Sequence, residues 1–456
     1  MLGERNVIVP PSIASTLTRN AACAQRWDIG IIGAGVAGAS LAIHLARQGR
    51  SVLLIESQRF PREKVCGGCL NQRAIALLDE LGVLAECIEA GAIEIDALRI
   101  RQGLREHRWS IPRMLSIRRS TLDTLLVKEA IASGAHYLDQ TFASIDPSNQ
   151  VSSSEVLIQL RAVNTSNDEL PSSLVLRNEK TAFELRVDVA AVAAGLTRSP
   201  LTRSRLSPSS PNLNLTNDAT KAEAQSTLRD TWPARTEPHS RIGVQALIAA
   251  ELLEDCDWSR ILHSKTQDDL RMLIGQDGYL GISRTDGGFY DFAAALDPAA
   301  ITRYRSIAGA IDHLLSECRL PSVGSLTVDG WKSTPHLTRR SWPVARNRIF
   351  LLGDSMGYVE PFTGEGMSWA MAGAKWLSKR LQDAPISSAK DEFSSQAIAD
   401  VETAWNHWAG NQRRRHQSIC RWVAGQVRHP TRTAWVLQGL AWIPPVRNIL
   451  LRKATQ

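Results

Sequence analysis

The sequence lacks any apolar run that approaches the ~18 residues of a membrane span, so no integral membrane protein is expected. Between Met1 and Trp27 it also lacks the continuous apolar stretch of a secretory signal. Cysteine is scarce, with seven in 456 residues, and an odd count in a long chain argues against a disulfide framework. These absences favour a reducing compartment, and the cytoplasm is the expected location.

The composition is otherwise that of an ordinary globular protein. Apolar residues make up 43% of the chain and charged residues 22%, with 30 glycines and 20 prolines, which is neither a disordered nor a fibrous composition. At about 150 residues per domain, this length predicts two or three domains.

The chain opens with a strand–helix–strand pattern. A strand is expected over Trp27–Ile32, a helix over Val36–Gln48 and a buried strand over Val52–Ile55, and this order predicts a parallel sheet. Further helices are expected over Ser116–Ser133, Ile301–Cys318 and Met367–Leu381, and further strands over Val156–Val163, Ser173–Arg177, Phe183–Val192, Arg241–Ala250, Met272–Gly275, Tyr279–Ser283, Phe289–Leu296 and Arg348–Leu352. The predicted fold class is α/β, with a Rossmann-type domain, a second sheet-rich domain and a helical C-terminal tail.

A glycine turn joins the first expected strand to the first helix as G-x-G-x-x-G. Gly33 permits the tight turn, Gly35 lets backbone N–H groups approach a pyrophosphate, and Gly38 lets the helix pack against the strand. Glu56 ends the next strand, where a carboxylate accepts hydrogen bonds from an adenosine ribose and repels a 2′-phosphate. The pattern therefore predicts a site for NAD or FAD rather than NADP.

A second glycine-rich pattern follows the strand over Arg348–Leu352. It begins with Gly353-Asp354 and continues with Pro361-Phe-Thr-Gly364-Glu365-Gly366-Met367, which opens another helix. The order of the two patterns resembles the FAD-binding fold shared by group A flavin monooxygenases, geranylgeranyl reductases and flavin-dependent halogenases.

The resemblance implies roles for the residues of this second pattern. Asp354, after Gly353, would bind a ribityl hydroxyl of FAD. The segment from Pro361 to Met367 would present backbone N–H groups of Gly364, Glu365 and Gly366 to the N1/C2 edge of the flavin. A helix N-terminus at that place would stabilise the negative charge of reduced flavin.

One further segment narrows the resemblance to the geranylgeranyl reductase branch, and another adds a contact with FAD. The run Phe60-Pro-Arg62-Glu-Lys-Val-Cys66-Gly67-Gly68 is similar to the segment that passes beside the isoalloxazine ring in that branch. Arg119 begins an R-x-x-L-D pattern that is similar to the start of a helix in contact with FAD. The resemblance implies cofactor contacts for Arg62 and Arg119, and it makes Cys66, Gly67 and Gly68 the flavin-proximal candidates, with no catalytic residue assigned.

One stretch departs from the hydroxylase pattern. Many group A hydroxylases carry A-D-G-x-x-S before the substrate domain, and here Ala194 replaces that Asp. The route by which NAD(P)H reduces those hydroxylases is therefore weakened for this chain, and NAD(P)H is retained only as one candidate reductant.

Cys66 and Cys69 form a C-x-x-C pair with three interpretations. A zinc site is disfavoured because no second C-x-x-C completes four ligands, so no metal is expected. A redox-active pair beside the flavin is the second interpretation. The favoured one is that both are small residues lining the flavin edge.

The C-terminal region is basic and rich in tryptophan. Nine Lys or Arg and a single acid, Glu402, lie between Val401 and Gln456. Arg414, Arg421 and Arg428 share one helical face, beside an apolar stripe of Ile419, Trp422, Val423 and Val427. The stripe predicts either a cap packed on the flavin domain, which is favoured, or a peripheral membrane contact. Nucleic acid is not an expected partner, because no binding module accompanies the charge.

These patterns divide the chain into expected segments. They are a flexible N-terminal extension (1–26), a discontinuous FAD-binding domain (27–95, 114–198 and 341–385), a substrate domain (96–113 and 241–340), a flexible insertion (199–240) and the basic, Trp-rich helical C-terminal region (386–456).

The expected function is that of an FAD-dependent oxidoreductase with a small apolar molecule as substrate. The favoured reaction is that of a reductase, with hydride passing from reduced flavin to an isoprenoid- or polyketide-like substrate. The alternatives are a flavin monooxygenase that uses a C4a-hydroperoxide, and a non-catalytic FAD-binding protein. No oligomeric state is indicated.

Overall fold

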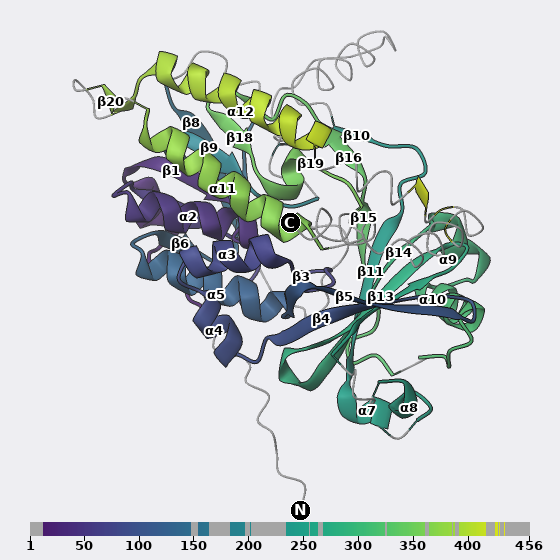
Figure 1. Cartoon of the computed structure of the whole chain (residues 1–456). Helices are drawn as coiled ribbons and strands as arrows, with labels where there is room; N and C mark the ends of the chain where they lie inside the picture. The colour runs from purple at the N-terminus through teal and green to yellow at the C-terminus, as the bar shows by residue number, and fades with distance from the viewer. Residues whose placement is uncertain are drawn as a thin grey trace, which may run out of the picture.

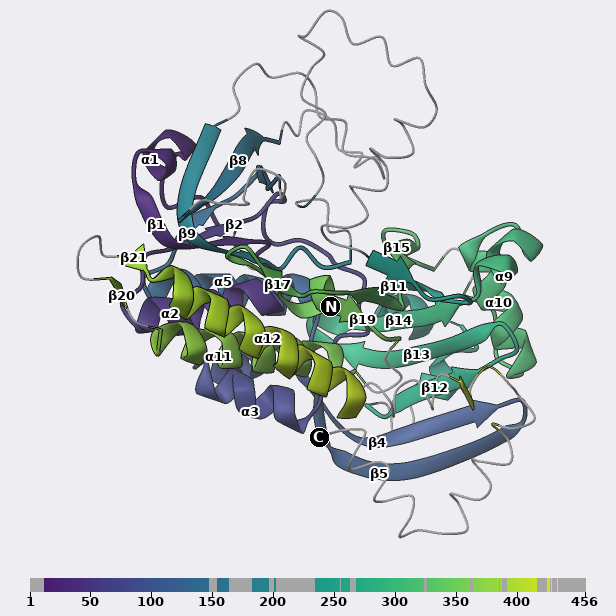
Figure 2. The same ribbon diagram turned by 90° about the horizontal axis from the view of Figure 1, so that it is seen from above.

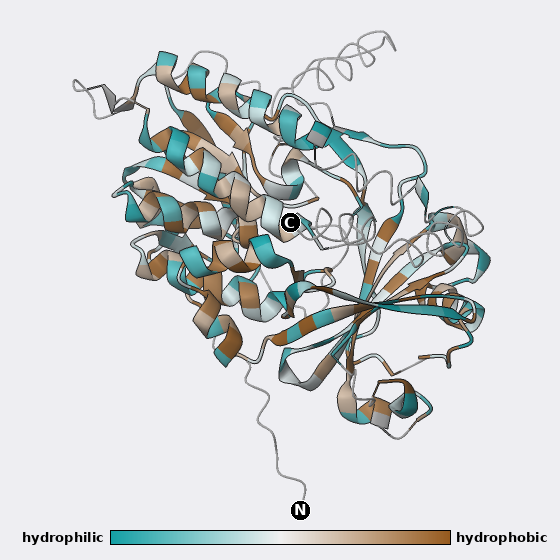
Figure 3. Cartoon of the chain, in the orientation of Figure 1, coloured by the Kyte–Doolittle hydropathy of each residue, from teal (hydrophilic) through white to brown (hydrophobic). Residues whose placement is uncertain are grey.

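Two eight-stranded sheets organise the chain, which is seen here in a computed structural model (Figure 1). The structure describes residues 12–146, 154–163, 183–196, 201, 234–254, 256–262, 268–323, 326–360, 364–384, 386–387, 392–415, 425–426, 428 and 433. In Figure 3, hydrophobic residues are frequent in the strands of the first sheet, whereas the strands of the second sheet carry both hydrophobic and hydrophilic residues.

The first sheet is a parallel sheet with an antiparallel extension. Its strand order is β17-β18-β9-β1-β2-β6, and β8 joins β7 to β9. Strand β1 pairs in parallel with both β2 and β9. Its members are β1 (Arg26–Ile32), β2 (Val52–Ile55), β6 (His136–Leu138), β7 (Thr141–Ser144), β8 (Val156–Ala162), β9 (Phe183–Val192), β17 (Ala345–Arg346) and β18 (Ile349–Leu351). The expected strand–helix–strand opening is confirmed.

Helices from distant parts of the sequence cover this sheet. Helix α2 (Val36–Arg47) packs between α5 (Arg119–Ala132) and α11 (Gly366–Gln382) (Figure 2). Helices α3 (Gln72–Glu80) and α4 (Leu84–Glu89) continue this layer. Every residue of β2 is buried, because a central parallel strand is covered on both faces.

The second sheet has one face in a core and one face on a cavity. Its order is β15-β11-β14-β13-β12-β4-β5-β3. Its members are β3 (Cys69–Leu70), β4 (Ile93–Gln102), β5 (Arg105–Ser116), β11 (Ile242–Ala249), β12 (Leu270–Ile274), β13 (Gly278–Thr285), β14 (Phe289–Leu296) and β15 (Lys332–His336). Residues such as Ile282 and Phe292 join a core with α10 (Ile307–Glu317), whereas Tyr279 and Met272 belong to a separate apolar cluster.

Short elements complete the described chain. They are α1 (Arg19–Cys23), α7 (Ala250–Glu254), α8 (Ser259–Leu262), α9 (Pro298–Arg303), the single-turn helices η3 (Asp286–Gly288) and η4 (Gly353–Met356), a small sheet of β10 (Ala234–Thr236), β16 (Arg339–Ser341) and β19 (Gly357–Tyr358), the hairpin β20 (Ile386–Ser387) with β21 (Glu392–Phe393), and α12 (Ser395–Arg415).

Three expectations about local structure are wrong. The expected helix over Ile301–Cys318 is split into α9 and α10, because Arg305 has a left-handed φ of 63° and the Ser306 hydroxyl caps α10 by accepting from Gly309 N at 2.9 Å. The expected loose extension is ordered from Ile13, which is buried. Strands β3 and β4 begin before residue 96, so this part of the expected FAD-binding segment pairs with the second sheet instead.

Several expected segments lie wholly or largely outside the described residues. They are 1–11, the strand over Ser173–Arg177, most of the insertion at 199–240, and, in the tail, Ile419, Arg421, Trp422, Val423 and Val427. The choice between cap and membrane contact for that stripe stays a prediction. None of the described helices is long and apolar enough to cross a membrane.

Helix α12 packs on α11 through a cluster of three tryptophans. The ring centroids of Trp405 and Trp408 are 4.8 Å apart, and Trp376 of α11 lies 5.4 Å and 5.6 Å from them. The indole N–H of Trp405 donates to Leu351 O at 3.2 Å, at the end of β18. This part of the C-terminal region therefore packs on the helices and strands of the first sheet.

We expect Trp405→Ala to lower the free energy of unfolding by about 3–5 kcal/mol, because it empties a fully buried site. Trp342→Ala is the matched control, since that side chain is half exposed and its loss should cost under about 1 kcal/mol. Urea unfolding followed by far-ultraviolet circular dichroism measures both values. Equal losses in the two variants would show that α12 does not contribute to the folded core.

Candidate functional site

A cavity of about 540 Å³ is lined by residues of both sheets. Gly35, Arg119 and Asp354 line it from the side of the first sheet, and Met272 and Tyr279 line it from the second sheet. Its size is within the range of small-molecule and cofactor sites. Ten of the sixteen site residues singled out in the sequence line it, although they come from four separate stretches of the chain. Gly33, Gly38, Glu56, Arg62 and Glu365 are not among its lining residues.

Glycine occupies the three positions of the first motif for different physical reasons. A Cβ on Gly38 would lie 1.9 Å from Gly33 O, so only glycine lets α2 pack on β1. Gly33 has a φ of 102°, a conformation that L side chains rarely adopt. Gly35 has an ordinary φ of −76° at the N-cap of α2, so its backbone does not demand glycine. A side chain there would instead project toward the guanidinium groups of Arg62 and Arg119, each 3.4 Å away, and fill the edge of the cavity.

Buried ion pairs lie beside this turn. Arg119 makes a bidentate pair with Asp123 at 2.8 Å and 2.7 Å, and Arg62 bridges Asp123 and Glu56, 3.3 Å from each. Burial alone would raise the pKa of Asp123, but Arg119 and Arg62 outweigh it and hold the pKa below its ordinary value.

The Glu56 carboxylate is held at the end of β2 by several donors. It accepts hydrogen bonds from the backbone N–H groups of Ala34, Ser57 and Gln58 at 2.9–3.1 Å. Burial would raise its pKa, but Arg62 and these backbone donors together lower it. Glu56 is therefore an ionised acceptor at neutral pH. Its contact with a ribose stays a prediction.

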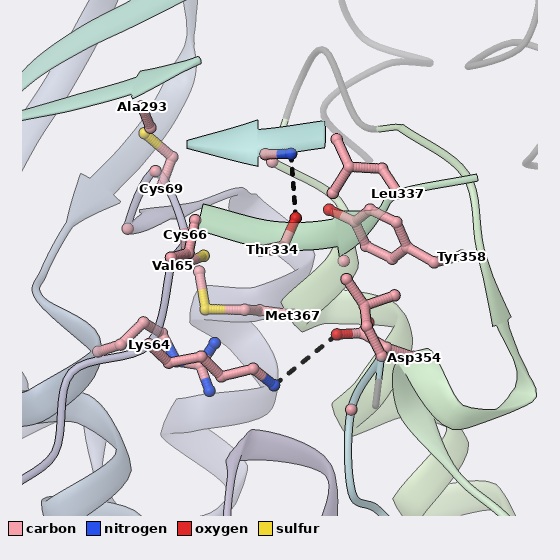
Figure 4. Close-up of a pocket in the computed structure, with 18 of the residues that line it drawn as sticks. Lys64, Val65, Cys66, Cys69, Ala293, Thr334, Leu337, Asp354, Tyr358 and Met367 are labelled. Carbon is pink, nitrogen blue, oxygen red and sulfur yellow. Dashed lines mark hydrogen bonds and ion pairs between the residues drawn. The ribbon is translucent and has the colours of Figure 1, made fainter. Parts of the chain in front are cut away.

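On the other side of the cavity, Asp354 faces Lys64. Its carboxylate lies 3.8 Å from the Lys64 ammonium (Figure 4). Gly353, which precedes it, has a φ of 59°, and this turn ends β18 and presents Asp354 to the cavity. Lys64 belongs to the segment that also carries Cys66 and Cys69 (Figure 4).

Helix α11 begins against this segment. Gly364 has a φ of 74°, and a Cβ on it would lie 3.1 Å from Cys69 O, so glycine permits the close approach. Glu365 is the N-cap, and Gly366 and Met367 line the cavity. The N-terminus of this 17-residue helix therefore reaches the cavity with its partial positive charge. Pro361 lies outside the described residues.

Cys66 and Cys69 are both free thiols. Burial, reinforced by Asp291, raises the pKa of Cys69 to about 12, so it stays protonated and unreactive at neutral pH. In the described part of the chain, no group of three or more His, Cys, Asp or Glu is placed to hold a metal ion.

Sequence reasoning missed two polar residues at this cavity's second wall. Asp291 lines it from β14, and Gln245 of β11 donates to Asp291 Oδ2 at 2.8 Å. The two residues are far apart in sequence and meet only because β11 pairs with β14. Asp123 was also left out of the expected site, although its i, i+4 spacing from Arg119 is a readable signal.

The donor set fits an FAD molecule. Two helix N-termini, at Gly35 and Gly366, reach one cavity, which suits the pyrophosphate and an anionic ring edge. Arg62, Arg119 and Lys64 add cationic side chains, and the glycines leave room for close approach. The individual cofactor contacts expected from the resemblance stay predictions.

Comparison with known protein families identifies this domain. Residues 26–154 match the family described as "FAD binding domain". The chain therefore carries an FAD-binding domain, and FAD is the cofactor that the domain binds.

Curated relatives match only a short part of the chain. They include conditioned medium factor receptor 1 of Dictyostelium discoideum (43% identical over 63 residues, 14% of this chain and 12% of that protein) and menaquinone reductase of Mycolicibacterium smegmatis (45% over 58 residues, 13% and 14%). A third is squalene epoxidase erg1 of Aspergillus fumigatus (39% over 74 residues, 16% and 14%). The chain thus matches about an eighth of the length of these relatives.

The fold as a whole is shared with solved flavoenzymes. A flavin-dependent brominase superposes with a TM-score of 0.67 at 16% identity, over 94% of each chain. At this identity the likeness shows the fold alone, and the α/β fold class is confirmed.

We expect Gly35→Val to purify with little FAD, because the new side chain occupies the approach to the N-terminus of α2 while the backbone conformation remains allowed. Gly410→Ala, in α12 with no atom closer than 4.0 Å to the added Cβ, is the control and should keep full occupancy. The ratio of flavin to protein absorbance measures occupancy. Full occupancy in Gly35→Val would contradict the assignment of this turn.

Removing the Asp354 carboxylate tests the second motif in the same way. Asp354→Ala should weaken FAD binding by about 1.5–3 kcal/mol if the carboxylate accepts a hydrogen bond from the cofactor. Titration of the apoprotein with FAD, followed by flavin fluorescence, gives the dissociation constant. Lys64→Ala separates the two roles: an equal loss there would mean that the ion pair, rather than a contact of Asp354 itself, matters.

The buried ion pairs predict an acid-sensitive stability. Because the folded pKa of Asp123 is lowered, its contribution is present above its unfolded pKa of about 3.9 and is lost as pH falls through the folded value. Asp123→Asn should cost about 3–5 kcal/mol at neutral pH, and less as the pH falls. Urea unfolding of the FAD-loaded protein checks this, with exposed Asp79→Asn as control. A loss independent of pH would mean that Asp123 is not an ionised partner.

Proposed function

We propose that this chain, which carries an FAD-binding domain, is an FAD-dependent oxidoreductase of the reductase type that acts on an apolar, isoprenoid- or polyketide-like molecule. The observation that carries the proposal is the continuity of the cavity, which joins the glycine cradle to the apolar face of the second sheet. The match to menaquinone reductase and the resemblance to the geranylgeranyl reductase branch support this choice.

The apolar wall fits a substrate with little charge. Strands β12 and β13 contribute Leu270, Met272 and Tyr279, and Leu337 closes the wall beyond β15. Such a wall excludes water and binds apolar surface at roughly 25 cal/mol per Å². It therefore selects for a hydrocarbon-rich molecule over a charged metabolite.

When bound, FAD supplies the hydride and the electrons for the reaction. The chain supplies orientation and electrostatics. The N-terminus of α11, at Gly364–Gly366, would stabilise negative charge on the reduced ring, and the Lys64–Asp354 pair would hold the cofactor beside it. NAD(P)H is one candidate reductant.

The second candidate function is that of a monooxygenase, and the match to squalene epoxidase over 74 residues supports it. The two reactions make opposite demands on dioxygen. A reductase needs none, whereas a monooxygenase places an oxygen atom from dioxygen in its product. Anaerobic and aerobic reactions of the same reduced protein therefore separate them.

The test is a mixing experiment with the FAD-loaded protein, reduced by light under argon. Menadione and geranylgeraniol represent apolar acceptors, and pyruvate is the polar control. We expect an apolar acceptor to restore the oxidised flavin spectrum without dioxygen and to be recovered in reduced form. Ala293→Leu, which narrows the cavity beside Gly67, should slow this step while FAD stays bound.

Two results would overturn the reductase. Product formation that requires dioxygen and incorporates its oxygen supports the monooxygenase. Flavin reoxidation that no apolar acceptor accelerates, with or without dioxygen, supports a non-catalytic FAD-binding protein.

A further inference from the structure

The part of the cavity wall that the second sheet forms contains one acidic side chain, Asp291, among apolar residues. Asp291 lies on β14 with Ala293 and Ala295 two and four positions further along, and all three line the cavity. Tyr290 and Phe292, on either side of Asp291 in the sequence, belong to the core on the other face. Strand alternation therefore places Asp291 on the cavity face, where it is only 2% exposed.

Asp291 is held in place through one oxygen only. Gln245 Nε2 donates to Asp291 Oδ2 at 2.8 Å and to Cys66 O at 2.9 Å. The orientation of this amide is fixed because Cys66 N donates to Gln245 Oε1 at 3.3 Å. The other oxygen, Oδ1, is buried and has no hydrogen-bond partner among the described residues. A buried polar atom without a partner is costly, at roughly 1–3 kcal/mol, unless a ligand or water satisfies it.

The surroundings of Asp291 disfavour its charge. Burial raises its pKa well above the ordinary value, the hydrogen bond from Gln245 lowers it in part, and Glu63 and Asp286 raise it further. Its cross-strand neighbours are Ser283 of β13 and Leu247 of β11, and the thiol of Cys69 also interacts with it. Burial and these acidic neighbours disfavour the ionised form of Asp291, so its carboxyl keeps its proton to a higher pH than an exposed aspartate does, although Asp286 is itself paired with Arg118 at 3.1 Å.

We propose that Asp291 is a specificity-determining residue, whose carboxylic acid O–H donates a hydrogen bond from Oδ1 to a carbonyl oxygen at one end of an otherwise apolar substrate. This deepens the proposed function and rests on it for the statement that the ligand is a substrate. Gln245 is the positioning residue, because it engages Oδ2 and leaves the proton on Oδ1.

A neutral donor and an ionised carboxylate select different ligands. A protonated Asp291 favours a ketone or quinone oxygen, which accepts a hydrogen bond without bringing charge into an apolar chamber. An ionised Asp291 would favour an ammonium group instead. The class of ligand therefore reports the state of the carboxyl.

The experiment measures equilibrium binding to the oxidised, FAD-loaded protein, so no turnover is needed. Three probes of similar shape are used: menadione with two carbonyl groups, methylnaphthalene with none, and naphthylmethylamine with an ammonium group. Perturbation of the flavin absorbance spectrum gives each dissociation constant. Wild type should bind menadione more tightly than the other two, by on the order of tenfold.

The variants separate the hydrogen bond from the fold. Asp291→Leu should abolish the preference for menadione over methylnaphthalene. Asp291→Asn should retain it, because an amide can accept from Gln245 and donate from its N–H₂ group. Asp268→Leu, in the turn before β12, with a side chain 42% exposed and outside the cavity, is the control and should keep the wild-type preference. FAD content and the melting temperature are recorded for each variant.

The pH dependence gives a second readout that does not depend on Asp291→Leu folding. Raising the pH through the titration of Asp291 should weaken menadione binding to wild type and leave Asp291→Asn unchanged. Equal binding of menadione and methylnaphthalene to wild type, no binding of either, or tighter binding of the amine would each overturn the proposal.

Failure of this inference is distinguishable from failure of the proposed function. Suppose that apolar acceptors reoxidise the reduced flavin, but the three probes bind Asp291→Leu as they bind wild type. Then the hydrogen bond proposed for Asp291 is wrong, and the proposed oxidoreductase function is retained. If Asp291 selects menadione but no acceptor reoxidises the flavin, the hydrogen bond proposed for Asp291 is retained and the proposed reductase function is wrong.

Discussion

The buried carboxylate of Asp123 is the charge on which the nucleotide side of the site depends. It holds Arg119 in a bidentate pair and shares Arg62 with Glu56, so two guanidinium groups stand beside Gly35 in fixed positions. Neither arginine would be stable so close to a helix N-terminus without a buried anion, because both would repel its partial positive charge. The site thus has cations available for a phosphate group without an unpaired charge in the core.

The cavity takes its two characters from the two sheets that border it. The first sheet supplies backbone donors at the ends of β1 and β18, where parallel strands pass into helices or turns. The second sheet supplies an apolar face, because its strands alternate between the cavity and the core beneath α10. The segment from Lys64 to Cys69 connects them, since Lys64 contacts Asp354 and Cys66 is bonded to Gln245. A structural change in either sheet therefore affects the segment from Lys64 to Cys69.

The buried carboxyl group on the side of the second sheet has different neighbours from the buried carboxyl groups on the side of the first sheet. Asp123 and Glu56 are paired with cations, which keeps them ionised, whereas Asp291 has acidic neighbours and one amide donor. Aspartate therefore occurs in two electrostatic environments here: Asp123 is held ionised on the nucleotide side, and the pKa of Asp291, in the apolar wall of the cavity, is shifted toward the protonated form. The difference lies in the neighbouring side chains and not in burial, because both carboxyls are almost fully buried.

The sequence alone determined the features that depend on near neighbours. The turn from Gly33 to Gly38, the strand at Val52–Ile55 and the α/β class follow from short-range sterics and periodicity, and the structure and comparisons confirm them. Short-range reasoning failed where one residue decides the outcome, as at Arg305, whose left-handed φ divides an otherwise continuous helical pattern. Only the tertiary structure decided that Gln245 and Asp291 meet, that α12 packs on α11, and that β3 pairs with β5 in the second sheet. The physical reason is that pairing between distant strands sets which side chains share a face, and no local pattern encodes the partner of a strand.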